Sequence, residues 1–561
     1  MQQRFGYTSE FSIGVSDKPA TSFYHSTYDI AFFALGTKVY YRDFTAEETI
    51  DTGITLTDGT VTRFDEFNGD VYLSNTTDGL RRIVVMRLND AAATLGDTSV
   101  TVDVDGAARL SVFSITTGNL RIQGTNEAFA SLVVATGVVT LSGTLSASYS
   151  DNTIAIVVSD ISTGREKPSK LLFWKSRLHL MGFPSATNAD QPNNTVVTGQ
   201  FIAGNADEIE KIIDFTFGTG GSTKITVGGG GTVKNIIGAA DTIYFLNEKK
   251  VFATAASAIA TTGATIGATF PDCKDELHGC INEDCATVMG QNALTYVADK
   301  RIMRLPIDTD TGAALSAPEE DFDVGIRDHL NDMDKDQAGA LVYHYRGGRQ
   351  TIYQLKIAGQ WYWFIYDHNV IRPQGSNFVR GTWQPPQQIG PFASLFERNG
   401  VLYGTDASTD AVYSIFTSFT DNLSPIYSVF ATGNYSVGNA MVKRAELQGE
   451  VSQPTRININ CYVTNDTGGR RTGSVKTIDG SNYTYNGDIS VGAVPVGDGG
   501  TGDSVDIARW KRGFGVFPSE GSFVQIVADN ELSDSAGSGW FSFTSLNIDG
   551  TQFPIPFSRS L

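Results

Sequence analysis

The stretch that decides the fold runs from Pro168 to Gly199, PSKLLFWKSRLHLMGFPSATNADQPNNTVVTG. It contains two short runs typical of β-strands, Leu171–Trp174 and Leu178–Met181, and a third run follows at Thr195–Thr198. Short apolar runs that are separated by turn residues predict the strands of a meander. One such unit cannot bury its apolar face alone, so it predicts neighbours of the same kind.

Similar units recur farther along the chain. Their first strands begin near residues 243, 294, 341 and 401, and each unit is an apolar strand, a polar turn and a second apolar strand. A spacing of about 50 residues is in the range of propeller blades. A propeller also closes its sheets into a ring and so hides strand edges that would otherwise be exposed. The sequence therefore predicts an all-β fold with a β-propeller of five to seven irregular blades.

The pattern divides the chain into four parts. Residues 1–30 are polar with scattered aromatic side chains, and they predict an extended N-terminal arm that needs a partner surface. Residues 31–89 and 165–420 contain the repeated units and predict the propeller. Residues 90–164 almost lack aromatic side chains and predict an inserted small β domain of sandwich type. Residues 434–561 again show strand patterns and predict a C-terminal β-sandwich.

One hairpin is expected inside the inserted domain. Val100, Val102 and Val104 alternate with polar residues, and Asp105 with Gly106 is a common hairpin turn. A returning strand would then extend to about residue 112.

The charge of the chain limits its partners. Its formal net charge is −19, from 42 basic and 61 acidic residues. A surface that grips nucleic acid needs clustered Lys and Arg, and docking on anionic membranes needs the same. The N-terminus lacks a signal-peptide pattern, and no apolar run approaches the ~20 residues that cross a bilayer. We expect a soluble protein that is synthesised in the cytoplasm and does not insert into membranes.

Cysteine and histidine provide the sharpest local candidate for a site. Cys273, His278, Cys280 and Cys285 are close together in the sequence, and thiolates with an imidazole suit zinc. No pair has the common C-x₂-C spacing, so structural thiols are the favoured interpretation and zinc is the alternative. Nucleotide-binding and hydrolase motifs are absent, so we expect no catalytic residue and no cofactor.

An acidic stretch spans residues 319–336. It is either a solvated loop or a patch that faces a passage or a basic partner. Its carboxylates are Glu319, Glu320, Asp321, Asp323, Asp328, Asp332, Asp334 and Asp336.

An aromatic cluster lies at Trp361–Tyr366 and is joined by Trp383. It could form a platform for a sugar or be buried between blades. Burial is favoured, because the residues alternate within a predicted strand.

Three segments resemble propeller-bearing structural proteins of tailed bacteriophages, in particular the nozzle or tubular tail proteins of short-tailed phages. The first is a strand followed by a glycine and a Pro-Ser turn: Trp174, Arg177, Leu178, Gly182, Pro184 and Ser185. The second is a Gly-Cys segment before the hairpin Leu294–Leu305, and the third is WYWFIYDHN, residues 361–369, with the later GTWQPP, residues 381–386. The resemblance covers about residues 165–420, with a weaker similarity in 440–561, and the segment 90–164 falls outside it.

The resemblance implies a non-enzymatic protein of the virion tail. It implies a homo-oligomer, with a hexamer expected, that joins an adaptor or portal ring and tail fibres and forms part of the DNA exit channel. DNA would pass without specific binding, and we expect some carboxylates of residues 319–336 to line the passage. The alternative is a host-adhesion or carbohydrate-binding propeller module, which would need paired carboxylates over an aromatic floor.

Overall fold

The short apolar runs form strands that are covered on both faces. β3 (Ile30–Leu35), β19 (Thr242–Asn247) and β23 (Ala293–Ala298) are buried at every position. Successive side chains of a strand point to opposite faces of its sheet, so continuous burial means that the sheet is packed on both sides. Each sheet therefore lies between two others, as the blades of a propeller do.

The computed structural model describes most of the chain up to residue 418 and the backbone of strands beyond it. The described residues are 6–14, 21–57, 61–90, 93–112, 115–160, 167–175, 177–182, 195–200, 222–228, 231–256, 271–374, 377–384, 386–418, 420–421, 424–425, 429–431, 435–452, 456–464, 470–472, 476–479, 507–530, 541–548 and 551–554.

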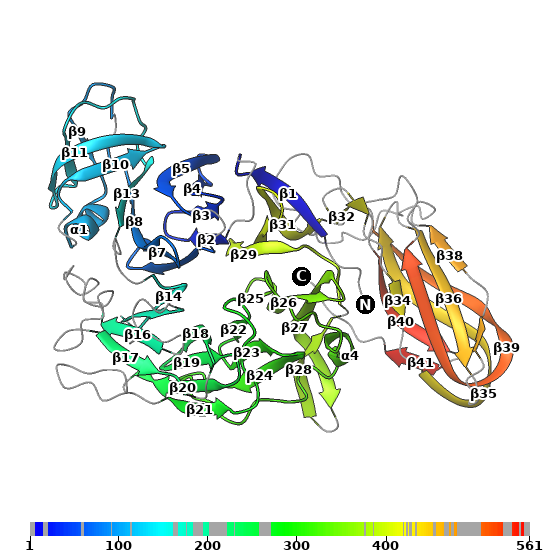
Figure 1. Ribbon diagram of the computed structural model, residues 1–561. Coiled ribbons are helices and arrows are strands. Elements are labelled where there is room, and N and C mark those ends of the chain that lie inside the picture. The colour runs from blue at the N-terminus through cyan, green and yellow to red at the C-terminus, as the bar shows by residue number, and fades with distance from the viewer. Residues whose placement is uncertain are drawn as a thin grey trace.

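Seven sheets form the blades in this part of the chain (Figure 1). The first blade contains β2 (Thr21–His25), β3, β4 (Lys38–Asp43) and β5 (Glu48–Thr55). The second contains β6 (Arg63–Phe67), β7 (Asp70–Asn75), β8 (Gly79–Arg87) and β13 (Ile154–Asp160). The third contains β14 (Lys170–Trp174), β15 (Arg177–Met181), β16 (Thr195–Gln200) and β17 (Ser222–Thr226). The next two contain β18 (Val233–Ala239), β19, β20 (Val251–Ala255) and β21 (Asp272–Asp275); and β22 (Ala286–Met289), β23 and β24 (Arg301–Pro306). The last two contain β25 (Leu341–Tyr345), β26 (Gln350–Ile357), β27 (Gln360–Gln374) and β28 (Asn377–Trp383); and β29 (Phe392–Arg398), β30 (Val401–Asp406), β31 (Ala411–Ser418) and β1 (Gly6–Ser12).

The blades close into a ring around a central axis. Their innermost strands are β2, β6, β14, β18, β22, β25 and β29, and each contacts the next in this order. The ring is complete because β29 also contacts β2. The predicted all-β propeller is confirmed, and its blade number is seven.

The described N-terminal residues, 6–14 and 21–30, belong to the ring, which corrects the expectation of an arm that needs a partner surface. β1 pairs antiparallel with β31 and so becomes the fourth strand of the last blade. Tyr7 packs edge-on against Phe392 and Tyr413 of the same blade, with ring centroids 5.6 and 5.1 Å away. The partner surface is thus the last blade of the same chain's propeller.

The inserted domain extends the second blade outward. Its strands β9 (Ser99–Thr101), β10 (Gly118–Ile122), β11 (Thr125–Val133) and β12 (Val138–Leu141) continue the sheet beyond β13. A bridge joins Val102, directly after β9, to Leu88, directly after β8. The strands therefore curl into a small barrel rather than the predicted sandwich. β13, expected in the insertion, pairs along its whole length with β8 and completes the blade.

A helix stands where the sequence predicted a hairpin in this domain. α1 (Val104–Val112) begins after Asp103, whose carboxylate accepts a hydrogen bond from the Gly106 amide at the helix start. A Cβ at Gly106 would lie 2.2 Å from Cγ of Met86, so this glycine serves the close approach of the helix to β8 rather than a turn.

The C-terminal strands form a separate antiparallel sheet of eight strands (Figure 1). They are β34 (Val429–Ala431), β35 (Tyr435–Ser452), β36 (Arg456–Thr464), β37 (Arg470–Thr472), β38 (Lys476–Asp479), β39 (Ile507–Asn530), β40 (Phe541–Ile548) and β41 (Thr551–Pro554). The connection from the propeller passes through β32 (Thr420–Asp421), which pairs with β1, and β33 (Ser424–Pro425).

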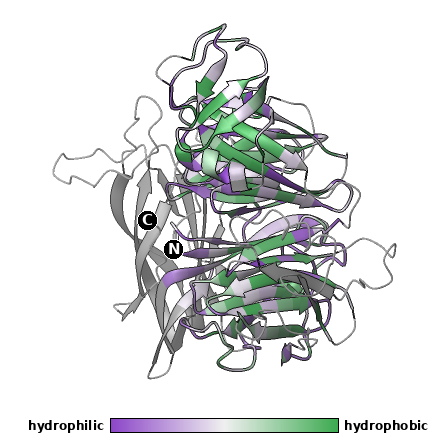
Figure 2. Ribbon diagram, turned by 90° about the vertical axis from the view of Figure 1, so that its left-hand side faces the viewer, coloured by the Kyte–Doolittle hydropathy of each residue, from purple (hydrophilic) through white to green (hydrophobic). Residues whose placement is uncertain are grey.

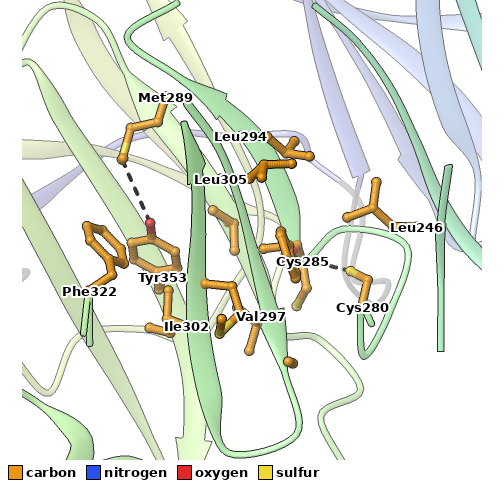
Figure 3. Packing of buried hydrophobic residues seen from close by; sticks show 14 of the residues in the cluster. Leu246, Cys280, Cys285, Met289, Leu294, Val297, Ile302, Leu305, Phe322 and Tyr353 are labelled. Carbon is orange, nitrogen blue, oxygen red and sulfur yellow. Dashed lines mark hydrogen bonds between the residues drawn. The ribbon is translucent and has the colours of Figure 1, made fainter. Parts of the chain in front are cut away.

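Apolar side chains between blades hold the ring together. In Figure 2, hydrophobic residues, coloured green, lie along the strands of the blades. One large cluster joins the fourth, fifth and sixth blades, and Figure 3 shows Leu246, Leu294, Leu305 and Tyr353 within it. No helix in the described residues is long and apolar enough to span a membrane.

Candidate functional site

Polar side chains gather at one end of the central axis, where innermost strands begin. Arg63 is the first residue of β6, Lys170 is the first residue of β14, and Asp284 lies just before β22. In a propeller the innermost strands surround a central channel. The first residues of these strands therefore meet, although they are far apart in the sequence. We call Arg63, Lys170, Asn235, Glu283 and Asp284 the axial cluster.

Arg63 is the centre of the axial cluster. Its Nε and Nη2 donate to the two carboxylate oxygens of Asp284, at 3.1 and 2.8 Å. Its Nη1 lies 2.6 Å from Oε2 of Glu283. The Arg63 side chain is 15% exposed, whereas that of Asp284 is 47% exposed, so water still reaches the pair from the channel.

The ion pairs decide the pKa values of both partners. Burial by itself would lower the pKa of Arg63, but the carboxylates of Asp284 and Glu283 raise it above its ordinary value. Burial would likewise raise the pKa of Asp284, and Arg63 with Lys170 lowers it. Both residues are therefore charged at neutral pH.

Lys170 extends the axial cluster to two further blades. Its Nζ donates to Oδ1 of Asn235 in β18 at 2.6 Å and to the backbone carbonyl of Glu283 at 2.8 Å. Burial lowers its pKa. The backbone of Asp284 accepts a hydrogen bond from the Val342 amide in β25 at 2.8 Å. The second to sixth blades thus all contribute to this end of the channel.

Asp65 joins the second and third blades next to the axial cluster. One of its oxygens accepts a hydrogen bond from the Phe173 amide of β14 at 2.6 Å, and the other accepts one from the Glu66 amide at 2.9 Å. Burial raises the pKa of Asp65 to about 6. Such a pKa suits a general acid or base, but both oxygens already accept backbone hydrogen bonds.

The hydrogen bonds and ion pairs of the axial cluster link neighbouring blades. Its charged groups are paired with one another or with backbone groups. The described residues contain no group of three His, Cys, Asp or Glu side chains that could hold a metal ion. Sequence reasoning missed the axial cluster, because no spacing motif links Arg63, Lys170 and Asp284.

The four candidate zinc ligands do not converge on one point. Cys280 and Cys285 are buried in the apolar cluster of Figure 3, and the Cys280 thiol donates to the carbonyl of Asn282 at 3.1 Å. The Cys273 thiol donates to the carbonyl of Asp275 at 3.3 Å, and Nδ1 of His278 lies 3.2 Å from the carboxylate of that residue.

The ionisation of the thiols agrees with a structural role. Burial raises the pKa of the Cys280 thiol to about 12 and raises that of Cys285 well above its ordinary value. These buried thiols are therefore protonated in the protein without metal, and their structural role stays a prediction.

The eight carboxylates of residues 319–336 do not act as one group. Asp323 is buried between two arginines, with Nε of Arg301 at 2.8 Å and Nη2 of Arg327 at 2.6 Å. Glu319 pairs with Arg304, and Asp334 accepts a hydrogen bond from the Gly359 amide. The remaining five are exposed: Glu320, Asp321, Asp328, Asp332 and Asp336.

The first part of this acidic stretch lies at the outer rim of the propeller. Glu319 bridges to Arg304 in β24, the outermost strand of the fifth blade. Phe322 accepts a hydrogen bond at its carbonyl from Trp383 of β28, the outermost strand of the sixth blade. Residues 319–322 therefore lie away from the propeller's own channel. After the short helix α4 (Arg327–Leu330) the stretch runs inward, because Met333 bridges to Ile357 of β26 and the Gln337 carbonyl accepts a hydrogen bond from Asn282, next to the axial cluster.

The aromatic cluster packs inside the propeller. Trp363, Phe364 and Tyr366 are buried, and Trp363 donates from Nε1 to Gln354 at 3.0 Å. Trp361, Tyr362 and Trp383 are partly buried against the same core. The sequence-based preference for burial agrees with this packing.

A relay of hydrogen bonds links two histidines of the sixth blade. Nε2 of His344 accepts from the Gly290 amide at 3.3 Å, which leaves the proton on Nδ1, 3.0 Å from Oγ1 of Thr351. Thr351 can then donate to Nε2 of His368 at 2.9 Å. Burial lowers the pKa of both histidines, that of His368 to about 4.

The fold and the axial cluster define a seven-bladed β-propeller whose blades are clasped by ion pairs near its axis. No family model matches the chain, and no curated protein matches it. Among solved structures it is similar to a chain of the mitotic checkpoint complex, with 10% identity, 74% of this chain and 93% of that chain covered, and a TM-score of 0.36.

Two other solved structures have comparable similarity. Hsv2 of Kluyveromyces lactis has 8% identity, covers 66% of this chain and 99% of its own, and gives a TM-score of 0.28. A luciferin-regenerating enzyme has 10% identity, covers 73% of this chain and 95% of its own, and gives a TM-score of 0.29. Similarities this low carry no argument about function, and the propeller assignment rests on the strand pairing and the closed ring.

Proposed function

We propose that the chain is a non-enzymatic structural protein of a bacteriophage tail, in which copies assemble into a ring around the path of the genome. The resemblance of residues 165–420 to nozzle proteins of short-tailed phages supports this proposal. One observation in the fold supports the non-enzymatic part of the proposal: the charged groups of the axial cluster pair with one another and so hold neighbouring blades together. Arg63, for example, pairs with both Glu283 and Asp284.

The proposal places the protein in the virion tail as a homo-oligomer. We expect a hexamer. It would contact an adaptor or portal ring, and it would also contact tail fibres. The net charge of −19 supports a wall along which DNA slides without binding, because contacts to phosphates need clustered cations. Among the exposed carboxylates of residues 319–336, those at the rim between the fifth and sixth blades would face this passage only if that rim faces the ring axis.

The adhesion or carbohydrate-binding alternative lacks a specific supporting observation. It requires an aromatic floor, and in the described aromatic cluster of residues 361–366 and 383 the side chains are buried or partly buried against the core, with Trp363 fully buried.

Negative-stain electron microscopy of the purified chain, combined with light scattering, tests the proposal. We expect six-fold rings and a mass of about six chains. DNA should show no binding in fluorescence anisotropy at physiological salt. A stable monomer, or micromolar affinity for DNA, would refute the proposal.

A further inference from the structure

We infer that the side chains of Lys170 and Asn235 react with each other to form an isopeptide bond between the third and fourth blades. Lys170 is the first residue of β14, and Asn235 lies in β18, so the bond joins two innermost strands. The inference goes beyond the proposed function, because it assigns a chemical modification within one chain. It can be tested whether or not copies of the chain assemble.

The two reacting groups are in contact. Nζ of Lys170 donates a hydrogen bond to Oδ1 of Asn235 at 2.6 Å. The amide carbon Cγ is bonded directly to this oxygen, so the amine lies beside the atom that it attacks. A second hydrogen bond, to the backbone carbonyl of Glu283 at 2.8 Å, holds the amine in place. Groups that are held together in this way react much faster than the same groups do when they are free in solution.

The surroundings of Lys170 favour the neutral amine, which is the nucleophilic form. Burial is the main cause that lowers its pKa, and the guanidinium of Arg63 acts in the same direction. The carboxylates of Asp284 and Glu283 oppose this shift without cancelling it. Desolvation and a neighbouring cation are recognised ways to activate a lysine as a nucleophile. More of the Lys170 side chain is therefore in the reactive form than is the case for an ordinary lysine.

The amide of Asn235 carries the second observation. Asn235 is 0% exposed, and its Nδ2 has no hydrogen-bond partner among the described residues. A buried donor without a partner costs free energy, and such groups are often found where chemistry takes place. Nδ2 is also the atom that leaves in the reaction, and no hydrogen bond holds it back. Its release as ammonia removes the unpaired donor from the interior.

The reaction is balanced without any further reactant. The lone pair of Nζ attacks Cγ of Asn235, and the bond between Cγ and Nδ2 breaks. One proton of the attacking amine passes to the departing nitrogen, which leaves as ammonia. The neighbouring carboxylates of Asp284 and Glu283 can relay this proton. The Asp284 side chain is 47% exposed, so ammonia can leave through the water of the channel.

Other lysines of the propeller show why this pair is distinctive. Lys38 lies 2.7 Å from a carboxylate oxygen of Asp51, and Lys175 lies 2.6 Å from one of Asp241. Both lysine side chains are 48% exposed, so water solvates their ammonium groups. The hydrogen bond to Asp51 raises the pKa of Lys38, which keeps its amine protonated. Close contact alone therefore does not provide the neutral amine or the buried amide of the axial cluster.

The bond would strengthen one junction of the ring. The blades meet there through hydrogen bonds and ion pairs, and the described cysteines, Cys273, Cys280 and Cys285, are free thiols. A covalent link between distant residues restricts the unfolded chain, as a disulfide does. The third and fourth blades would then stay joined under a load that breaks the ion pairs of the axial cluster.

Mass spectrometry of the full-length chain under denaturing conditions tests the inference. We expect the mass to be lower than the sequence mass by one ammonia. Trypsin should also release a branched peptide in which Nζ of Lys170 is joined to the side chain of Asn235. The branched peptide is decisive, because the loss of ammonia within a single asparagine or glutamine produces no branch.

Two variants and a matched control separate the reaction from other losses of ammonia. Lys170→Arg keeps a positive charge and hydrogen-bond donors but has no nucleophilic amine, and Asn235→Ala removes the amide. Neither variant should yield the branched peptide, and both should melt at a lower temperature than the wild type. The control is Lys234→Arg, because Lys234 is adjacent in sequence to Asn235 but pairs with Glu248 at 3.0 Å. It should yield the same branched peptide as the wild type.

The wild-type chain decides the question even if a variant fails to fold. A wild-type chain that keeps its full sequence mass after prolonged incubation at mildly alkaline pH would overturn the inference. A mass deficit that persists in Lys170→Arg would also overturn it. Six-fold rings without the branched peptide would refute the isopeptide bond and leave the proposed function standing, whereas monomers that contain it would do the reverse.

Discussion

Arg109 of α1 forms a buried ion pair with Asp70 of β7, and this pair attaches the inserted barrel to the propeller. Asp70 also accepts from Nε of Arg82 at 2.8 Å, so one carboxylate is shared by two arginines. All three side chains are buried. Removal of the Asp70 carboxylate leaves uncompensated positive charge in the interior, and breaking a buried ion pair in this way typically costs about 3–5 kcal/mol.

Asp70→Ala should therefore destabilise the propeller more than Arg109→Met does. The first substitution leaves two buried arginines without their carboxylate, whereas the second leaves Asp70 paired with Arg82. Urea unfolding followed by tryptophan fluorescence measures the difference. Asp105→Asn is the matched control: its carboxylate lies 3.2 Å from Arg109 but is 83% exposed, so its loss should change stability by less than about 0.5 kcal/mol. Equal losses for Asp70→Ala and the control would contradict this account.

Asp284 of the axial cluster and the neighbouring Asp65 should make stability depend on pH in two opposite ways. The pKa of Asp284 is lowered in the folded chain, so its contribution is complete above its unfolded pKa of about 3.9 and is lost as the pH falls below that value. The pKa of Asp65 is raised to about 6, so the folded state gains stability as the pH falls from 7 towards 4.

Variants separate the two contributions. Asp284→Asn should reduce the pH dependence of the free energy of unfolding below about pH 4. Asp65→Asn should reduce it between pH 4 and about 6. Chemical unfolding at a series of pH values provides the profile. If Asp65→Asn leaves the profile unchanged between these values, the raised pKa is wrong.

The histidine relay predicts a further loss of stability in mild acid. The pKa of His368 is lowered to about 4, below its unfolded value of about 6.5, so the stability it provides is present above 6.5 and decreases as the pH falls towards 4. Thr351→Val removes the buried hydroxyl between the histidines and should cost about 1–3 kcal/mol at pH 7, because the half-buried ring nitrogens of His344 and His368 lose their partner. Thr351→Ser keeps the hydroxyl and should behave like the wild type. Unfolding curves at pH 7 and 5 distinguish the two variants.

Deletion of the inserted domain should succeed only with boundaries that keep β13. Removal of residues 90–164 would take away the fourth strand of the second blade, so we expect an insoluble product. Removal of 90–152 with a short Gly/Ser bridge keeps Arg87 paired with Ile154. This deletion would expose the apolar side chains of Met86 and Val157, which now pack in the barrel core. The double substitution Met86→Thr with Val157→Thr should therefore improve the soluble yield of the deletion variant. Cooperative thermal unfolding of the 90–164 deletion would contradict the prediction.

The cysteines should be independent of metal. Because burial holds Cys280 and Cys285 as neutral thiols, we expect purified protein without stoichiometric zinc, and EDTA should not lower its melting temperature. Elemental analysis together with a thermal scan decides the matter. One zinc per chain would restore the alternative that the sequence left open.

The sequence by itself determined the strands of the blades and the all-β class. Residues 242–247 and 293–298 are apolar runs between turn residues, and this local pattern is sufficient because each strand is covered on both faces. The same local reasoning failed at Asp105 and Gly106. There the glycine is required by the contact with Met86, a residue of another element, and a turn motif contains no information about that contact.

Only the tertiary structure decided the blade number, the role of the N-terminus and the axial cluster. β1 completes the last blade by pairing with β31, about 400 residues later, and ring closure alone brings these strands together. Arg63, Lys170 and Asp284 form a cluster for the same reason, since each lies where an innermost strand begins. Ionic contacts of this kind depend on where separate strands meet, whereas hydrophobic periodicity depends on neighbours along one strand.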